Sequence, residues 1–254
     1  VGTMGKTFKT IDDAVIRFAG DSGDGMQLTG GRFTETTAVV GNDLSTLPDF
    51  PAEIRAPAGS LAGVSAFQIH FSSKDIHTPG DSPDVLVAMN PAALKVHQKE
   101  IVPGGTIILN TDAFTKKNLN FAGYENSPVE DGTLDDYFTL IPIEMNKLVT
   151  AACEGLEMSR KFVGRTKNFF ALGVLYYMYD RPLDATEKWL EKKFKGKDII
   201  IEANKRAMNA GYNYADTTEL FTTRYKVEKA VLPKGTYRNI NGNYATSLGL
   251  LAAS

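Results

Sequence analysis

Residues 20–25 combine glycines and acids in a pattern that suits ligand binding at a turn. The turn follows a short apolar run, 15–19, and precedes a helix-compatible stretch, 26–40. A strand, a glycine turn and a helix in this order expose backbone N–H groups to a ligand in a doubly wound fold. The candidate cofactor-binding residues of this turn are Gly20, Gly23, Asp24 and Gly25.

The chemistry of this turn argues against a dinucleotide. Its spacing is G-x-x-G-x-G and not G-x-G-x-x-G, and Asp21 and Asp24 place negative charge where a pyrophosphate would approach. A purely structural interpretation is equally open, in which the glycines permit a tight turn and Asp24 helps to cap the helix.

A second candidate is the proline-rich loop over residues 50–63. Its small residues would let a ligand or another backbone come close, and Arg55 could hold a carboxylate or phosphate in a bidentate fork. Pairing of Arg55 with Glu53, or solvation, is the favoured interpretation from the residues alone. Ser60 is a further candidate, although it also fits a turn hydroxyl.

Histidine and cysteine chemistry has little support. His70, His77 and His97 lie on separate predicted elements without metal-ligand spacing. Cys153 is the single cysteine, so this chain alone cannot supply the roughly four thiolates of an iron-sulfur cluster. No nucleophile motif is present, and no residue is assigned a catalytic role.

The composition is that of a globular protein. The chain has 254 residues, of which 43% are hydrophobic and 23% charged, with a formal net charge of −2. This balance gives no sign of nucleic-acid binding, and no apolar run reaches the roughly 20 residues of a membrane span. Without a signal-like segment, the expected location is cytoplasmic.

Alternating element types predict an α/β domain with a mostly parallel sheet over residues 10–213. Strands are expected at 15–19, 44–47, 67–72, 84–89, 106–109 and 139–143, and helices at 26–40, 90–100, 144–156, 167–179, 184–193 and 198–210. The alternation at 67–72 predicts a half-buried strand. Residues 214–238 are expected to be an extended linker, and 239–254 to begin a new helix and a further domain.

Several segments taken in order resemble the 2-oxoacid:ferredoxin oxidoreductase family, in particular α subunits with a γ domain fused ahead of the thiamine-binding domain. They are the turn 20–25, the loop Pro-Ala-Glu-Ile-Arg-Ala-Pro at 51–57, the strand and helix at 84–98, and the helix start at 167–173. The resemblance implies a Rossmann-like γ domain. It also implies that residues 239–254 start a pyrimidine-binding domain that continues beyond Ser254.

The resemblance further implies a reaction and its participants. The loop at 51–57 looks most like the 2-oxoglutarate branch of the family. The implied reaction is thiamine-dependent oxidative decarboxylation to an acyl-coenzyme A, or its reverse. Thiamine diphosphate, magnesium and a four-iron four-sulfur cluster would lie mainly outside this chain. The implied partners are a β subunit that carries the cluster, ferredoxin, the 2-oxoacid and coenzyme A.

Three alternatives stay open. The substrate could be pyruvate. The domain could also be a non-catalytic module that binds coenzyme A or a nucleotide. An NAD-dependent dehydrogenase is the weakest alternative, because the glycine turn is acidic and no convincing acid ends the second strand.

Overall fold

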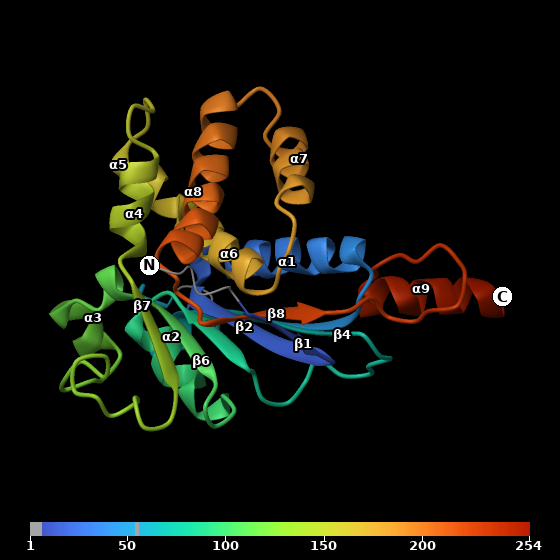
Figure 1. Cartoon of the computed structure of the whole chain (residues 1–254), viewed down its shortest axis with the longest axis horizontal. Coiled ribbons are helices and arrows are strands. Elements are labelled where there is room, and N and C mark those ends of the chain that lie inside the picture. The colour runs from blue at the N-terminus through green and yellow to red at the C-terminus, as the bar shows by residue number, and fades with distance from the viewer. Residues whose placement is uncertain (1–6, 54–55) are drawn as a thin grey trace.

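The computed structural model describes residues 7–53 and 56–254, which form a six-stranded sheet with helices on both faces (Figure 1). The strand order is β3-β4-β2-β5-β6-β7. The parallel strands are β2 (Asp13–Asp21), β5 (Val85–Ala88), β6 (Thr106–Asn110) and β7 (Thr139–Ile143). Strand β4 (Val64–Ser72) runs antiparallel between β2 and β3 (Asp43–Asp49). The predicted α/β class with a mostly parallel sheet is confirmed.

Strand β4 is buried on both faces, so the prediction of a half-buried strand was wrong. Gln68, one of its polar residues, is only 1% exposed. Its Oε1 accepts a hydrogen bond from Arg17 Nε at 2.9 Å, and its Nε2 donates to the Pro79 carbonyl oxygen at 2.7 Å. Because these polar atoms find partners inside the protein, the polar face of the strand does not need solvent.

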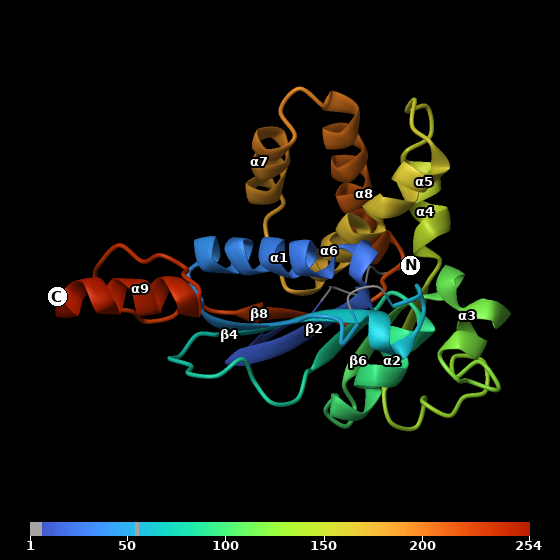
Figure 2. The same cartoon turned by 180° about the vertical axis from the view of Figure 1, so that it is seen from behind.

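The two faces of the sheet carry separate hydrophobic cores. Helices α1 (Met26–Val40) and α6 (Lys167–Met178) cover one face, and α2 (Pro91–His97) and α3 (Lys116–Phe121) lie on the other (Figures 1 and 2). Neighbouring residues of β2 enter different cores, because Phe18 packs in the first and Ala19 in the second.

Three of the later helices were predicted, namely α4 (Met145–Ala152), α7 (Asp184–Lys193) and α8 (Asp198–Thr217). Helix α7 has the predicted ends, whereas α4 ends earlier and α8 ends later than predicted. The short helix α5 (Arg160–Val163) was not predicted. Helix α6 is apolar almost all round because it is buried between the sheet and α8. The two helices approach closely at Gly173 and Gly211, where a Cβ would lie 2.0 Å from a carbonyl oxygen of the opposite helix.

Strand β5, helix α2 and strand β6 form a crossover unit between two parallel strands. Asn90 caps α2, since its Oδ1 accepts a hydrogen bond from Ala93 N at 2.8 Å, and Pro91 occupies the first turn. The carboxyl end of β5 is thereby fixed beside the glycine turn that follows β2.

The segment expected to be a linker contains regular structure. Residues 214–217 are the last turn of α8, and β8 (Thr223–Val227) pairs in parallel with β1 (Thr7–Ile11), a strand that the sequence did not predict. Both strands were missed because each is short, polar and stabilised only by pairing with a remote segment. Strand β8 ends at Val227. Within the expected linker, the residues from Glu228 to Arg238 contain no helix or strand.

The final helix, α9 (Gly242–Ala253), begins where the sequence predicted it and extends away from the other elements (Figure 2). Asn241 caps it, because its Oδ1 accepts a hydrogen bond from Tyr244 N at 2.9 Å. No residue of α9 is buried. Within residues 7–53 and 56–254, no helix is long and apolar enough to cross a membrane.

Candidate functional site

The glycine turn lies at the carboxyl end of β2, as predicted, and leads directly into α1. Gly20 has no room for a side chain, because a Cβ would lie 2.9 Å from an Asp24 carboxylate oxygen and 3.0 Å from Met89 Cβ. Gly25 has φ +79°, a left-handed conformation that favours glycine, and it also lies against Asn168. Gly23 faces open space. The packing at Gly20 and the backbone conformation at Gly25 therefore require glycine. At Gly23 the absence of a side chain leaves the backbone of the turn accessible to a ligand.

Asp24 does not carry an exposed, unpaired negative charge. Its Oδ1 lies 2.7 Å from Lys167 Nζ, with the two side chains only 14% and 18% exposed. Its Oδ2 accepts a hydrogen bond from the Asp21 backbone N–H at 3.0 Å. Asp24 thus holds the turn closed and links it to the start of α6.

Asp21 connects the turn to the proline-rich loop. Both of its carboxylate oxygens accept the Gly59 backbone N–H, at 3.0 and 3.1 Å. Burial raises the pKa of Asp21, the Gly59 N–H lowers it, and the nearby charge of Asp24 raises it, with a net upward shift. The two candidate segments named from the sequence, 20–25 and 50–63, are therefore in direct contact.

Within the loop, Ser60 is engaged in a turn. Its Oγ donates to the Pro57 carbonyl oxygen at 2.7 Å, and its backbone N–H donates to the same oxygen at 3.1 Å. Arg55 lies outside the described residues, so the interpretations of its side chain as a ligand contact or as the partner of Glu53 both stay predictions.

A cavity of about 380 Å³, here called the cationic pocket, adjoins Gly23 and Asp24. Its walls include Arg160, Lys161, Arg165 and Lys167, together with Asn146 of α4. These residues were not among the site residues predicted from the sequence. The available signal was the density of cations, since four lie within the eight positions 160–167.

A second cavity, of about 270 Å³ and here called the apolar pocket, shares Gly23, Asp24 and Arg165 with the first. Its apolar lining comes from α1, α6, α8 and the segments around α5 and α7, and consists of Leu28, Met158, Phe162, Phe169, Phe194 and Ile200. The Arg165 guanidinium lies 5.1 Å from the centre of the Phe162 ring. A charged and an apolar cavity therefore meet at the glycine turn.

Buried amides lie at the same edge of the sheet and were also missed. Asn90 lies two residues beyond the end of β5, and Asn110 is the last residue of β6; they are 4% and 0% exposed. Asn110 Nδ2 donates to the Met89 carbonyl oxygen at 3.2 Å, but Asn110 Oδ1 has no hydrogen-bond partner among the described residues. The Asn90 side chain lies near the Asp21 carboxylate and lowers its pKa. Asn110 thus leaves hydrogen-bonding capacity at the edge where α/β folds bind ligands.

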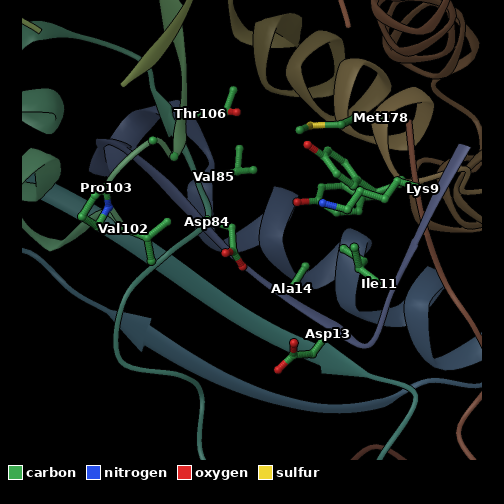
Figure 3. A pocket seen from close by; sticks show the side chains of 14 residues that line it. Lys9, Ile11, Asp13, Ala14, Asp84, Val85, Val102, Pro103, Thr106 and Met178 are labelled. Carbon is green, nitrogen blue, oxygen red and sulfur yellow. The ribbon is translucent and has the colours of Figure 1, made fainter. Parts of the chain in front are cut away.

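A further cavity, of about 260 Å³, lies at the opposite edge, near the amino ends of the parallel strands. Figure 3 shows Lys9 of β1, Asp13 and Ala14 of β2, and Asp84, which directly precedes β5, around it. Asp84 Oδ2 accepts the Val15 N–H at 2.7 Å, and burial raises the pKa of Asp84. Its carboxylate thus helps to hold β2, and the cavity is remote from the glycine turn.

The described residues offer no metal site or reactive thiol. They contain no group of three or more His, Cys, Asp or Glu side chains that could hold a metal ion. Cys153 is buried in the core at 3% exposure, and burial raises the pKa of its thiol. Cys153 is therefore part of the first hydrophobic core.

Residues 15–214 match the family described as pyruvate ferredoxin/flavodoxin oxidoreductase. The 2-oxoglutarate oxidoreductase subunit KorA of Mycobacterium tuberculosis is 52% identical over 243 residues, which cover 96% of this chain and 37% of that protein. The chain therefore spans little more than a third of this relative.

Solved structures share the fold at lower identity. A 2-oxoglutarate:ferredoxin oxidoreductase from Magnetococcus marinus, with 2-oxoglutarate, coenzyme A and succinyl-CoA bound, superposes with a TM-score of 0.64 at 24% identity. The match covers 88% of this chain and 34% of that one. The γ subunit of a keto/oxoacid ferredoxin oxidoreductase from Geobacter sulfurreducens has a TM-score of 0.55 at 16% identity, and the match covers 82% of this chain and 98% of that one.

Proposed function

Because the chain belongs to the pyruvate ferredoxin/flavodoxin oxidoreductase family, we propose that it is part of a 2-oxoglutarate:ferredoxin oxidoreductase. The proposed reaction is thiamine-dependent oxidative decarboxylation of 2-oxoglutarate to succinyl-coenzyme A, or the reverse reductive carboxylation. The single observation that carries the proposal is the 52% identity to KorA across nearly the whole chain.

Substrate choice rests on two supports. The first is the name of KorA as a 2-oxoglutarate oxidoreductase subunit, since its 52% identity is well above the 25% of the ketoisovalerate oxidoreductase subunit VorA of Methanothermobacter marburgensis. The second is the loop at 51–57, whose sequence resembles the 2-oxoglutarate branch. Gly59 of the same loop is anchored to the glycine turn through Asp21.

The redox centres do not fit the residues of this chain. An iron-sulfur cluster needs several thiolates, whereas the sequence has one cysteine, and that cysteine is buried in the core. The described residues also contain no group of three or more His, Cys, Asp or Glu side chains that could hold a metal ion. In the proposed enzyme, the cluster lies on a β subunit that passes electrons to ferredoxin, and thiamine diphosphate with magnesium lies mainly outside these 254 residues.

This chain contributes a γ domain over residues 10–213 in our proposal. A separate γ subunit of similar fold in Geobacter sulfurreducens supports a domain of this extent. The proposal keeps a linker at 214–238, although β8 ties it to the domain as far as Val227. Residues 239–254 would begin the pyrimidine-binding domain, where the exposed leucines of α9 find their packing partners. The proposed location is the cytoplasm.

The γ domain would handle coenzyme A and screen the reacting centre. The residues proposed to face the ligand are those of the glycine turn, Gly20, Gly23, Asp24 and Gly25, and those of the loop, Arg55 and Ser60. The glycine turn and the described part of the loop meet through the hydrogen bonds between Asp21 and Gly59.

The test is turnover by the assembled enzyme, produced with its β subunit and purified without oxygen. We expect coenzyme A-dependent reduction of ferredoxin with 2-oxoglutarate, at a kcat/KM at least roughly tenfold above that for pyruvate. We also expect the 254-residue chain alone to be colourless, free of stoichiometric iron and inactive. A higher kcat/KM for pyruvate than for 2-oxoglutarate would show that pyruvate is the substrate and would contradict the proposed substrate. Coenzyme A binding without turnover of either acid would favour the non-catalytic module.

A further inference from the structure

The cavity at the amino ends of the parallel strands, here called the edge cavity, is separate from the site at the glycine turn. No described residue lines both this cavity and the cationic or the apolar pocket. It lies between the two sheets, because β1 and β8 contribute one wall and β2 and β5 another (Figure 3). Its volume of about 260 Å³ is slightly below that of typical ligand pockets, which favours a small metabolite.

Lys9 places a positive charge at the edge cavity. In the parallel pair of β1 and β8, Lys9 lies opposite Tyr225 and Ile11 lies opposite Val227, so these four side chains share one face. Val227 is buried in the first hydrophobic core, which shows that this face is turned toward the main sheet. Figure 3 shows the Lys9 side chain extending over the cavity. Among residues 7–53 and 56–254, Lys9 forms no ion pair.

Asp84 supplies the opposite charge from the main sheet. Its Oδ2 accepts the Val15 N–H, but it has no ion-pair partner in the described part of the chain. Burial raises the pKa of Asp84, the Val15 N–H lowers it, and the charge of Asp13 raises it, with a net upward shift. Asp13 itself is bonded to His70, since its Oδ2 lies 3.0 Å from His70 Nε2. An ammonium group of a ligand beside Asp84 would offset the unfavourable burial of its charge.

A buried hydroxyl group also reaches the edge cavity without a partner. Tyr179 lines the cavity and is only 2% exposed, and its hydroxyl group has no hydrogen-bond partner among the described residues. The ring is fixed by its neighbours, because its centre lies 5.4 Å from that of Phe71 and 5.8 Å from that of Tyr225. Since a buried hydroxyl group without a hydrogen bond is unfavourable, Tyr179 points to a molecule that binds here.

Apolar side chains complete the wall of the edge cavity. They are Ile11 of β1, Val85 of β5, Met178 of α6, and Val102 and Pro103 before β6. A matching ligand has an ammonium group for Asp84, an anionic group for Lys9 and a short apolar body between the two sheets. An α-amino acid with an aliphatic side chain has all three.

We propose that the edge cavity binds an aliphatic α-amino acid as a zwitterion. The ammonium group would lie against Asp84 and the carboxylate against Lys9, with the Tyr179 hydroxyl group donating a hydrogen bond to the carboxylate. Because Lys9 belongs to β1 and Asp84 to the main sheet, the ligand would hold the pair of β1 and β8 against that sheet. The proposal is independent of the proposed function, because neither a 2-oxoacid nor coenzyme A takes part in it.

The experiment titrates the assembled protein by calorimetry with L-leucine and two analogues of its shape. Isoamylamine is leucine without the carboxylate, and isocaproate is leucine without the amino group. L-Valine is a smaller probe of the same class. The variant Lys9→Gln removes the proposed partner of the carboxylate, and Tyr179→Phe removes only the hydroxyl group.

Lys226→Gln is the matched control, because it removes the same charge from the same pair of strands. Lys226 is exposed, follows Tyr225 directly and therefore lies on the opposite face of β8, outside the edge cavity. Its ion pair with Glu228 is exposed and contributes little to stability.

We expect the wild type and Lys226→Gln to bind L-leucine at least about tenfold more tightly than either analogue, because each analogue loses one charge-assisted contact. Lys9→Gln should bind L-leucine and isoamylamine with equal affinity. Tyr179→Phe should bind L-leucine several-fold more weakly with an unchanged Tm, since its hydroxyl group has no partner in the described protein. Bound L-leucine should also slow amide hydrogen exchange in β1 and β8 of the wild type.

Three outcomes would overturn the proposal. The first is that neither L-leucine nor L-valine binds the wild type. The second is that Lys9→Gln and Lys226→Gln bind L-leucine alike. The third is that isoamylamine binds the wild type as tightly as L-leucine, which would make the cavity a site for a simple amine. Unchanged hydrogen exchange of β1 and β8 in the leucine-saturated wild type would contradict a ligand position between the two sheets.

Discussion

Asp21 and Asp24 show how a residue that looks unfavourable in the sequence can be accommodated by the fold. The sequence suggests that both acids repel a pyrophosphate. In the structure, Asp24 is paired with Lys167, and Asp21 accepts the N–H of Gly59. The position of the glycine turn could be predicted from local pattern. The partners of the two carboxylates could not, because Gly59 and Lys167 lie far along the chain and meet the turn only in the folded protein.

The first prediction concerns the titration of Asp21, and the variant is Asp21→Asn. The folded protein raises the pKa of Asp21 above its ordinary value of 3.8, so the folded state holds this proton more tightly than the unfolded state. The associated stabilisation is fully present below pH 3.8 and is lost as the pH rises through the raised pKa. The wild type should therefore lose stability relative to the variant between acidic and neutral pH.

Urea unfolding at a series of pH values measures this difference. The control is Asp136→Asn, an exposed acid outside the glycine turn and the proline-rich loop. A wild-type minus Asp21→Asn difference that does not change with pH would show that the Asp21 carboxyl group titrates alike in both states.

At the scale of elements, the periodicity of apolar residues predicted most helices and strands of the main sheet, because their own residue patterns show which side is buried. The strands of the parallel sheet and helices α1, α6 and α7 appear close to their expected ranges. Strands β1 and β8 escaped prediction because their pairing partners are remote. The second face of β4 was misjudged because Gln68 and Arg17 satisfy each other inside the protein. The residue pattern shows which side chains are polar, but it does not show which of them form hydrogen bonds with one another inside the folded protein.

The second prediction concerns the crossing of α6 and α8. Gly173→Ala should lower the free energy of unfolding by about 3 kcal/mol, because the added Cβ would lie 2.0 Å from the Met208 carbonyl oxygen and would push the helices apart. Gly31→Ala is the matched control, since nothing lies within 4 Å of its Cβ position in α1. The control should be neutral or more stable by about 0.5 to 1 kcal/mol.

Thermal and urea unfolding followed by circular dichroism compare the two variants. If both glycine variants unfold like the wild type, the two helices are not in the close contact that the structure describes.

At the scale of the whole molecule, the chain consists of one packed domain and the exposed helix α9. The six-stranded sheet and its covering helices contain the hydrophobic cores, whereas α9 and the residues from 234 to 241 are exposed throughout. Leu250 and Leu251 are 70% and 73% exposed, which is unfavourable for apolar side chains in water. The proposed pyrimidine-binding domain would supply their missing partners.

The third prediction follows from this division. Limited proteolysis of the 254-residue chain should cut first between residues 228 and 254 and leave a resistant product that ends near Val227, because β8 is held by β1. Mass spectrometry of the products locates the cuts. The assembled enzyme should protect the same segment. First cuts within the sheet, or equal resistance of α9 and the core in the isolated chain, would contradict the prediction.

The pairing of β1 with β8 can form only late in synthesis, because β1 is made first and β8 is made after all strands of the main sheet. The Thr7 hydroxyl donates to the Thr222 carbonyl oxygen at 3.1 Å across a separation of 215 residues. At about 5 to 20 residues per second, a ribosome needs roughly 10 to 40 s to make the intervening chain. The strands of the main sheet are all available earlier, since the last of them ends at Ile143. During that interval β1 has no partner strand. Any factor that binds extended segments of the nascent chain then competes with β8 for pairing with β1.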